Sequence, residues 1–388
     1  MVPRVRRPQI NVKLSFVYGS WACGPRPFDF SRLFEDPRGL TGSEISCFSF
    51  AKELALRGHE VKLFAPISSS SRLDWSGIRI FPISAWSDTR TGWTEDAVLS
   101  WNEPDNLRGV PAKSVRFVNQ QLNDFTYCQP GFDSCVDIYS SPCSAHLSHM
   151  VGKYGNGHKW VVLPNGCDPT AYPIIDKVPG RVLYASSPDR GLHWLLQQWP
   201  LIKRRVPEAN LRVFYNFDDW IQNLLPCEDP SHHPHVRECA YRAHYIREAF
   251  NRLKDSDVQH FKSISRLRMA EEMASALVLA YPCDTVTYTE GFSVTIMEAC
   301  AAGAVPVITD VDALGSVYGG SVKTIVRSPV RDHLEEWTEL VIRSLTESSF
   351  RKEATDNTKI LAEKHSWPVL TDRLEKILHD AIATKVGK

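Results

Sequence analysis

Apolar and polar positions along the chain alternate between short runs typical of buried strands and longer stretches with helical spacing. Residues 12–18 alternate and are rich in β-forming side chains, so we expect the first strand there. From Ser43 the apolar positions fit a helix that ends at Gly58, and the run 61–65 predicts the next strand. This strand–helix–strand unit is typical of nucleotide-binding α/β domains.

The same rhythm continues toward the end of the chain. Further strands are expected at 78–83, 97–101, 116–119, 136–140, 160–163, 181–185, 211–215, 259–261, 276–281, 305–309 and 321–326. Further helices are expected at 192–199, 266–276, 334–345 and 367–382, whereas 218–252 reads as a polar, histidine-rich segment that becomes helical only around 241–253. Such an order predicts an α/β protein with parallel sheets.

A turn-rich stretch, Pro164-Asn165-Gly166-Cys167-Asp168-Pro169, interrupts this rhythm near the middle of the chain. A chain of 388 residues is long enough for two domains, each with its own core. We therefore predict an N-terminal domain over 1–165, a C-terminal domain over 166–366, and a closing amphipathic helix over 367–388.

The charge balance narrows the choice of partners. Lys and Arg together number 45, as do Asp and Glu, so the formal net charge is zero and no overall field would attract nucleic acid or an anionic membrane. No apolar run reaches membrane-spanning length, and the N-terminus lacks the apolar core of a signal peptide. We expect a cytoplasmic protein with no transmembrane segment.

One cluster of cysteines and histidines could in principle hold a metal. Its spacing matches no common zinc pattern, and prolines interrupt it, so a solvated loop running into a helix explains it equally well. We therefore expect no metal at its members, which are Cys227, His232, His233, His235, Cys239 and His244.

The most informative chemistry lies between Glu290 and Glu298. A loop through Gly291, Phe292 and Ser293 opens a helix at Val294, and the free N–H groups of such a helix start suit a phosphate. Carboxylates would repel that phosphate, so both glutamates more plausibly accept hydrogen bonds from hydroxyls. The pattern favours a ligand with phosphates and sugar rings, such as a nucleotide sugar.

Two other loops follow predicted strands and could converge on this helix start. Arg190 lies between the strand 181–185 and the helix 192–199, where it would neutralise a diphosphate. Gly42-Ser43-Glu44 lies at the start of the first helix, where a helix cap is an equally good explanation of these residues. Ligands of open α/β sheets bind at the carboxyl ends of the strands, so we predict a shared site there.

These motifs together resemble the family 4 retaining glycosyltransferases. Glu290 and Glu298 resemble the family's E-x7-E motif, and the resemblance covers nearly the whole chain. The other matches, in chain order, are the first glycine-rich loop at 41–44, the end of the first helix at 57–61, the interdomain P-N-G-x-D at 163–168, the basic loop at 187–192 and the helix-to-strand exit at 302–307. The resemblance implies a GT-B fold, in which two Rossmann-like domains face each other across a cleft and a C-terminal helix crosses back.

The resemblance also implies roles for single residues. Glu290 and Arg190 would be catalytic, with Glu290 on the sugar hydroxyls and Arg190 on the diphosphate. The remaining donor-binding residues would be Gly42, Ser43, Lys262, Gly291, Phe292, Ser293, Val294 and Glu298, of which Glu298 holds the ribose. The family's basic loop usually carries a second cation, whose place is taken here by Ser186 or Ser187. Either Arg190 works alone, or Lys262 or Arg266 completes the site.

The acceptor side departs from the family pattern. Where the family often places a histidine near the donor sugar, the corresponding region reads Asn119-Gln120-Gln121-Leu122-Asn123-Asp124, so an amide would replace it. The predicted acceptor-binding residues are Glu44, Asn119 and Gln120. His146 and His149, on an expected helix, are interpreted as structural.

The function implied is a retaining, metal-independent hexosyltransferase that needs no cofactor and uses a UDP- or GDP-linked sugar. A nucleotide-sugar epimerase or phosphorylase of the same fold stays an alternative, as does a non-catalytic sugar-nucleotide or glycan-binding protein. The acceptor is open among a saccharide, a lipid-linked sugar, a small molecule, a protein and a modified nucleic-acid base. The oligomeric state is open as well.

Overall fold

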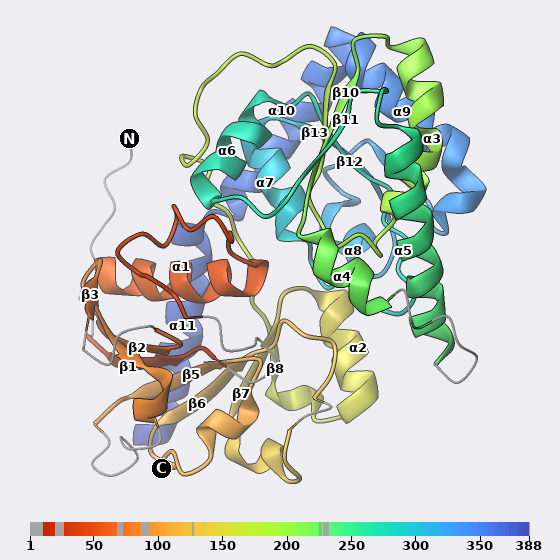
Figure 1. The fold of residues 1–388 in the computed structure, drawn as a ribbon. Coiled ribbons are helices and arrows are strands. Elements are labelled where there is room, and N and C mark those ends of the chain that lie inside the picture. The colour runs from red at the N-terminus through yellow and green to blue at the C-terminus, as the bar shows by residue number, and fades with distance from the viewer. Residues whose placement is uncertain are drawn as a thin grey trace.

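The computed structural model describes residues 11–19, 27–67, 73–86, 94–125, 128–224, 227 and 233–387. These residues form two domains, each built around its own parallel sheet (Figure 1). Among the described residues, no helix combines the length and apolar character that crossing a membrane requires.

The N-terminal domain is organised around an eight-stranded sheet in the order β3-β4-β2-β1-β5-β6-β7-β8. All neighbours pair in parallel except β3 and β4. The strands are β1 (Lys13–Val17), β2 (Glu60–Ala65), β3 (Leu73–Trp75), β4 (Ile78–Pro82), β5 (Ala97–Trp101), β6 (Val115–Asn119), β7 (Ile138–Ser141) and β8 (Trp160–Val162). The helices α1 (Gly42–Leu56) and α2 (Ser144–Tyr154) cover the sheet, and apolar cores lie on both of its faces.

The C-terminal domain holds a six-stranded, fully parallel sheet in the order β11-β10-β9-β12-β13-β14. Its strands are β9 (Arg181–Tyr184), β10 (Asn210–Phe214), β11 (Val258–Phe261), β12 (Val278–Tyr281), β13 (Val305–Thr309) and β14 (Ile325–Val326). Its helices are α3 (Leu192–Arg205), α4 (Phe217–Leu224), α5 (Pro234–Arg252), α6 (Arg266–Ser275), α7 (Val294–Ala302), α8 (Leu314–Tyr318), α9 (Leu334–Thr346) and α10 (Ser348–Lys364). In Figure 1, α6 and α7 lie on one side of this sheet and α3, α5 and α9 on the other.

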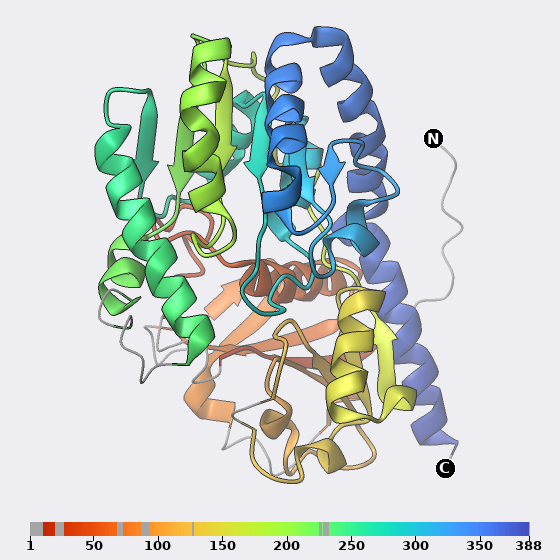
Figure 2. The same ribbon diagram turned by 90° about the vertical axis from the view of Figure 1, so that its right-hand side faces the viewer.

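The last helix, α11 (Trp367–Val386), crosses back to the N-terminal domain and packs against α1 (Figures 1 and 2). Its apolar side chains Trp367, Leu370, Leu374 and Leu378 belong to the core of that domain. At the edge of this contact, His59 Nε2 lies 2.7 Å from a carboxylate oxygen of Glu375. The predicted crossing helix is therefore confirmed, while the numerical domain boundaries 165 and 366 stay a prediction.

The two chain segments that join the domains run side by side. Cys167 N donates to His365 O at 3.0 Å, just before α11 begins. A Cβ placed on Gly166 would lie 2.6 Å from the same carbonyl oxygen, a distance that real Cβ atoms do not adopt. Glycine at this position therefore permits the close approach of the two connections.

Two sequence predictions in the C-terminal domain need correction. The segment after β10 is helical much earlier than expected, because α4 starts at Phe217 and α5 at Pro234. Proline suits the first turn of a helix, where its missing N–H costs no hydrogen bond, so Pro234 marks a helix start rather than part of a long loop. The strand expected at 321–326 is limited to β14, Ile325–Val326.

Candidate active site

The predicted catalytic pair is in direct contact. Arg190 precedes α3 and Glu290 precedes α7, and Arg190 Nη1 donates to Glu290 Oε2 at 2.8 Å. Tyr281, the last residue of β12, donates its hydroxyl to the same oxygen at 2.6 Å. Glu290 is 3% exposed, and its backbone N–H donates to the Asp312 carboxylate at 3.0 Å. Two side-chain donors thus hold the carboxylate, and the Asp312 carboxylate holds the backbone of Glu290, before any ligand contact is considered.

The electrostatics of this pair preserve the charge on Arg190. Burial is the largest single effect and disfavours the guanidinium, but Glu290, Tyr281 and Asp189 act together in the opposite direction and raise the pKa of Arg190. The Nε atom of Arg190 is buried and has no hydrogen-bond partner among the described residues. A charged guanidinium with an unused N–H is suited to a phosphate oxygen.

Gly191, which lies between Arg190 and the start of α3, shows how closely this loop packs against its neighbours. A Cβ on Gly191 would lie 1.8 Å from Pro282 O, and the φ angle of Gly191 is +97°. Both facts restrict the position to glycine. Arg242 of α5, which is 5% exposed, further fixes the loop by donating from Nη1 to Asp189 O at 2.6 Å. The sequence analysis gave Arg242 no role.

The start of α7 presents backbone N–H groups as the sequence predicts. Ser293 precedes the helix with φ of +62°, a left-handed conformation that is unfavourable for serine. The Tyr318 hydroxyl supports this turn by donating to Ser293 O at 2.7 Å. Thr295 Oγ1 donates to Ala185 O at 3.0 Å and ties the helix to the end of β9, while Phe292 is buried in the domain core.

The second glutamate is also paired. Arg266, at the start of α6, contacts both carboxylate oxygens of Glu298, one of them from Nη1 at 3.1 Å. Burial opposes the charge on Arg266, but Glu298 and the Tyr172 hydroxyl together raise its pKa. The structure thus brings Arg266 to Glu298, and its role as a second cation beside Arg190 stays a prediction.

Gly42 brings the N-terminal domain to this helix. A Cβ on Gly42 would lie 2.9 Å from Val294 Cγ2, so the first residues of α1 and α7 meet directly. Glu44 closes a capping box, because its carboxylate accepts from Thr41 N at 2.6 Å while Glu44 N donates to Thr41 Oγ1 at 3.4 Å. The capping interpretation of Glu44 is confirmed, and its role toward an acceptor stays a prediction.

An unpredicted residue, Asn102, connects the loops of the N-terminal domain. It adopts φ of +61°, and its Nδ2 donates to Ser43 Oγ at 3.0 Å. Its Oδ1 accepts from the backbone N–H of Gln121 at 2.6 Å and of Leu122 at 3.2 Å. Asparagine tolerates the left-handed conformation, and its side chain here joins the ends of β5 and β6 to α1.

The two predicted amides have different surroundings. Gln120 Nε2 donates to Leu122 O at 2.9 Å and to Asp124 O at 3.2 Å, so this amide shapes its own loop. Asn119 is 1% exposed, and its Nδ2 has no hydrogen-bond partner among the described residues. Only Asn119 therefore has an unused donor.

His146 lies closer to the proposed donor loop than the sequence analysis expected. A Cβ on Gly291 would lie 3.1 Å from His146 Cδ2. His146 Nδ1 lies 2.6 Å from Ser141 Oγ, and its Nε2 lies 3.2 Å from Leu122 O. Burial lowers the pKa of His146 to about 4, so the ring is neutral near pH 7. These bonds fit the interpretation of His146 as a structural residue. No local sequence signal reveals that His146 approaches the loop at Gly291, which lies far along the chain.

Two further contacts join His146's neighbourhood to the C-terminal domain. Asn123 Nδ2 donates to Thr289 O at 3.1 Å, and Cys143 Sγ lies 3.3 Å from Gly291 O. Residues of the N-terminal domain therefore contact the loop before α7.

Lys262 is placed elsewhere. It follows β11, its side chain is 73% exposed, and its ammonium lies 2.7 Å from the Asp218 carboxylate on α4. The structure thus brings Lys262 to Asp218, and its predicted role at the donor stays a prediction.

The cysteine and histidine cluster shows no metal geometry within the described part of the chain. No group of three or more His, Cys, Asp or Glu side chains is arranged to hold an ion among residues 11–19, 27–67, 73–86, 94–125, 128–224, 227 and 233–387. His232 lies outside these residues. His233 and His235 instead approach each other at the start of α5, where His233 caps the helix.

Sequence comparison and structure comparison give different results. No known family model matches the sequence, and no curated protein matches it. Solved structures do match: sucrose-phosphate synthase from Thermosynechococcus elongatus has a TM-score of 0.69 at 12% identity and covers 96% of this chain and 100% of that chain. WaaG, a glycosyltransferase involved in lipopolysaccharide biosynthesis, has a TM-score of 0.64 at 14% identity, with 94% and 99% of the two chains covered.

A third match carries a ligand. Anabaena Alr3699/HepE, solved in complex with UDP-glucose, has a TM-score of 0.63 at 13% identity, and the alignment covers 95% of this chain and 100% of that chain. At such low identity these structures establish the architecture alone. Two parallel-sheet domains, a crossing C-terminal helix and matches over nearly the full length of glycosyltransferases of this type show that the chain has the GT-B fold.

Proposed function

We propose that the chain is a retaining glycosyltransferase that moves a hexosyl unit from a UDP- or GDP-linked sugar to an acceptor hydroxyl. The observation that carries the proposal is the contact between Arg190 and Glu290 beside the amino end of α7, within a GT-B fold. It places a cation, a buried carboxylate and free helix N–H groups in one small volume, as a sugar diphosphate requires.

The donor would be held in three parts. The diphosphate would contact Arg190, whose Nε is unused, and the N–H groups of Gly291, Phe292, Ser293 and Val294 at the helix start. Sugar hydroxyls would donate to Glu290, since both of its observed side-chain bonds fall on Oε2 and leave Oε1 available. Glu298, oriented by Arg266, would accept from the ribose hydroxyls.

The reaction would follow a front-face route. The bond between the sugar's anomeric carbon and the diphosphate oxygen breaks, and the acceptor oxygen forms its bond on the same face. The acceptor's proton passes to the departing phosphate oxygen, so configuration is retained and charge balances. Arg190 and the fixed backbone N–H groups stabilise the negative charge that grows on the diphosphate, without needing to reorganise.

The acceptor would enter from the N-terminal domain. Gly42 and Ser43 would approach the donor phosphate, since Gly42 meets Val294. Asn119 has the unused amide donor, and we assign it, with Glu44 and Gln120, to the acceptor side. The HepE complex with UDP-glucose supports a UDP-linked sugar as the first donor to test.

The test is the affinity for nucleoside diphosphates, measured by titration calorimetry with UDP and GDP. Because Arg190 supplies a charge-assisted hydrogen bond, Arg190→Ala should weaken the preferred nucleotide by roughly 10- to 100-fold. A matched control is Arg343→Ala, which removes an exposed arginine of α9 and should leave the affinity unchanged. Equal affinity of the wild-type protein and Arg190→Ala would contradict the proposal.

A second measurement addresses metal dependence. With a nucleotide sugar and acceptor that give turnover, release of the nucleoside diphosphate should continue in excess EDTA, because Arg190 and backbone N–H groups neutralise the leaving group. Loss of turnover that a divalent cation restores would show that a metal takes part. A thermal-shift screen of nucleotide sugars would identify the donor beforehand, since a ligand that binds only the folded state raises its apparent stability.

A further inference from the structure

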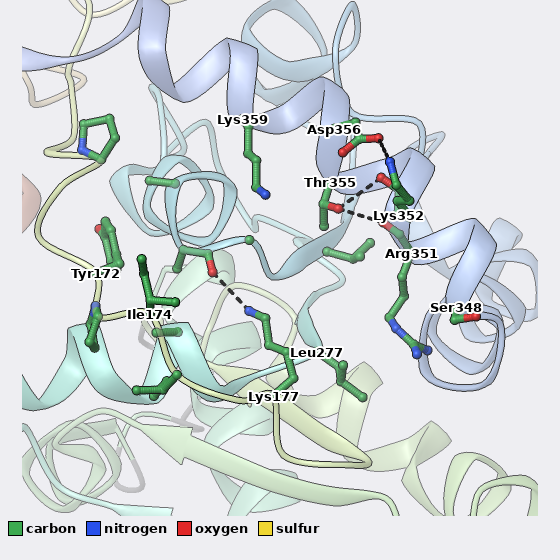
Figure 3. A pocket seen from close by; sticks show the side chains of 18 residues that line it. Tyr172, Ile174, Lys177, Leu277, Ser348, Arg351, Lys352, Thr355, Asp356 and Lys359 are labelled. Atoms are coloured by element: carbon green, nitrogen blue, oxygen red, sulfur yellow. Dashed lines mark hydrogen bonds and ion pairs between the residues drawn. The ribbon is translucent and has the colours of Figure 1, made fainter.

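A cavity of about 620 Å³ lies in the C-terminal domain at the opposite end of α7 from the proposed donor loop (Figure 3). The last residues of α7, Ala301 and Ala302, form one wall together with Gly303. Leu277 and Val305, at the amino ends of β12 and β13, form its floor. Its volume is in the range of small-molecule sites.

Two lysines converge on this cavity from different segments. Lys177 comes from the connection before β9, and its Nζ donates to Ala302 O at 3.0 Å. Lys359 comes from α10, and Figure 3 shows both ammonium groups pointing into the same space. A Cβ on Gly303 would lie 3.8 Å from Lys359 Cε and 3.9 Å from Lys177 Nζ, so both side chains approach one point.

The balance of charge around the cavity is positive. Arg351 and Lys352 also line it, and Asp356 is the one acidic side chain in the lining. Lys352 already pairs with Asp356 at 2.6 Å, and Arg351 donates to Ser344 O and Leu345 O at 3.0 and 2.8 Å. The Asp356 carboxylate is therefore already paired with Lys352.

Burial and the neighbouring Lys359 both disfavour the charge on Lys177. Burial first, and Lys359 second, lower the pKa of Lys177 to about 8. A negative group between the two ammonium groups would offset this effect on Lys177. The C-terminal carbonyl of α7 satisfies only one of the three donors of Lys177.

The mouth of the cavity is apolar rather than charged. Ile174 is fully exposed, Ile175 is 44% exposed, and Tyr172, Pro169 and Pro173 continue the apolar lining toward Leu277. Neighbouring exposed isoleucines over a concave surface mark a binding site more often than isolated surface residues do. A free inorganic anion would leave this apolar lining in water.

We propose that this cavity is a second binding site, separate from the donor site, for a small amphiphilic anion. Its phosphate or carboxylate head lies between Lys177 and Lys359, and its apolar body covers Ile174, Ile175 and Leu277. Charge complementarity selects the head, and burial of the exposed isoleucines supplies the hydrophobic part of the affinity.

The test is titration calorimetry of the full chain with n-octyl phosphate and with octanoate, which separates the two kinds of head group. At least one of them should bind at a single saturable site. Inorganic phosphate lacks the apolar chain and 1-octanol lacks the anionic head, so each should bind at least roughly tenfold more weakly. Absence of saturable binding by both amphiphiles would overturn the proposal. Equal affinity for inorganic phosphate would overturn its apolar part.

Variants locate the binding. Lys359→Met, at an exposed position of α10, should weaken the bound amphiphile by roughly tenfold or more, since a charge-assisted hydrogen bond is lost. Lys177→Met should act similarly, with its unfolding curve confirming the fold, and Ile174→Ser should reduce affinity by roughly tenfold. Lys254→Met, at an exposed lysine after α5 that does not line the cavity, is the matched control. Unchanged affinity in Lys359→Met and Ile174→Ser would overturn the assignment.

Binding of the amphiphile at this cavity can be tested independently of the proposed transferase activity. Arg190→Ala should leave the affinity for the amphiphile unchanged, while its nucleotide affinity falls. Loss of amphiphile binding in Arg190→Ala would place the amphiphile at the donor site and overturn the second site. Absence of nucleotide binding alone would contradict only the proposed function.

Discussion

The two sides of the contact between the domains are built from different chemistry. The C-terminal side holds two ion pairs, Arg190 with Glu290 and Arg266 with Glu298, each between a buried carboxylate and a partly exposed arginine. The N-terminal side is joined mainly by uncharged side chains, with Asn102 joining the ends of strands and neutral His146 packed against Gly291. Ion pairs thus organise the C-terminal side, whereas an amide fixes the shape of the loops that face it.

This difference predicts different consequences of substitution. A buried charge without its partner is costly, but the charges of the C-terminal side can also act on a ligand directly. A buried amide acts mainly by satisfying backbone N–H groups, so its loss should reduce stability by a smaller amount. The predictions below test this contrast from the largest expected effect to the smallest.

The largest effect should come from Glu290→Gln. The amide keeps the volume of the side chain and can still accept from Tyr281, but it loses the negative charge. We expect turnover with the cognate donor to fall by roughly 10²- to 10³-fold, the range for removing one preorganised electrostatic contact at a reaction centre. Steady-state kinetics measure this loss.

The matched control is Glu339→Gln. Glu339 lies on α9 in an exposed ion pair with Arg205, and turnover should be unchanged there. Near-normal turnover in Glu290→Gln would remove Glu290 from the reaction, and the contrast between the two sides would then rest on structure alone.

The second effect concerns pH and His146. Burial lowers the pKa of folded His146 to about 4 from a reference of 6.5, so as the pH falls the unfolded chain binds this proton first. The free energy of unfolding should therefore fall between pH 6.5 and pH 4, by about 1.4 kcal/mol per pH unit from this residue. His146→Gln should show a correspondingly shallower dependence in urea unfolding. Identical pH dependence in both proteins would contradict the assignment of a neutral, buried ring.

The smallest of the three effects should come from Asn102→Ala. Two backbone N–H groups lose their acceptor, and alanine is less favourable than asparagine at φ of +61°. We expect the free energy of unfolding to fall by about 2 kcal/mol. Asn251→Ala, on the exposed face of α5, should change it by less than about 0.5 kcal/mol. A change as small in Asn102→Ala would show that the amide network does not hold these loops.

Much of the architecture could be predicted from the sequence. Apolar runs such as β5 and β13 coincide with expected strands, because a buried parallel strand must be apolar whatever surrounds it. The expected loops at Arg190 and Gly291 also lie before helices, and Gly42 begins α1, since glycine and small polar residues carry local conformational information.

The errors have physical reasons as well. The first turns of α5 read as a loop because histidine and proline have low helix propensity, but Pro234 lies in the first turn, where it is tolerated. The role of Lys262 at the donor stays a prediction, and the structure places its flexible side chain beside Asp218. Charge type alone does not tell which carboxylate a lysine will meet.

The sequence by itself determined the fold class, the order of most strands and helices, and the loops that carry Glu290 and Arg190. Those features follow from short-range periodicity and local backbone preference, which depend on neighbouring residues. Only the tertiary structure decided that Arg266 pairs with Glu298, that Asn102 joins three loops, that His146 packs against Gly291, and that Lys177 and Lys359 meet at the end of α7. These contacts join residues far apart in the chain, and their partners are selected by packing and charge when the sheets and helices assemble.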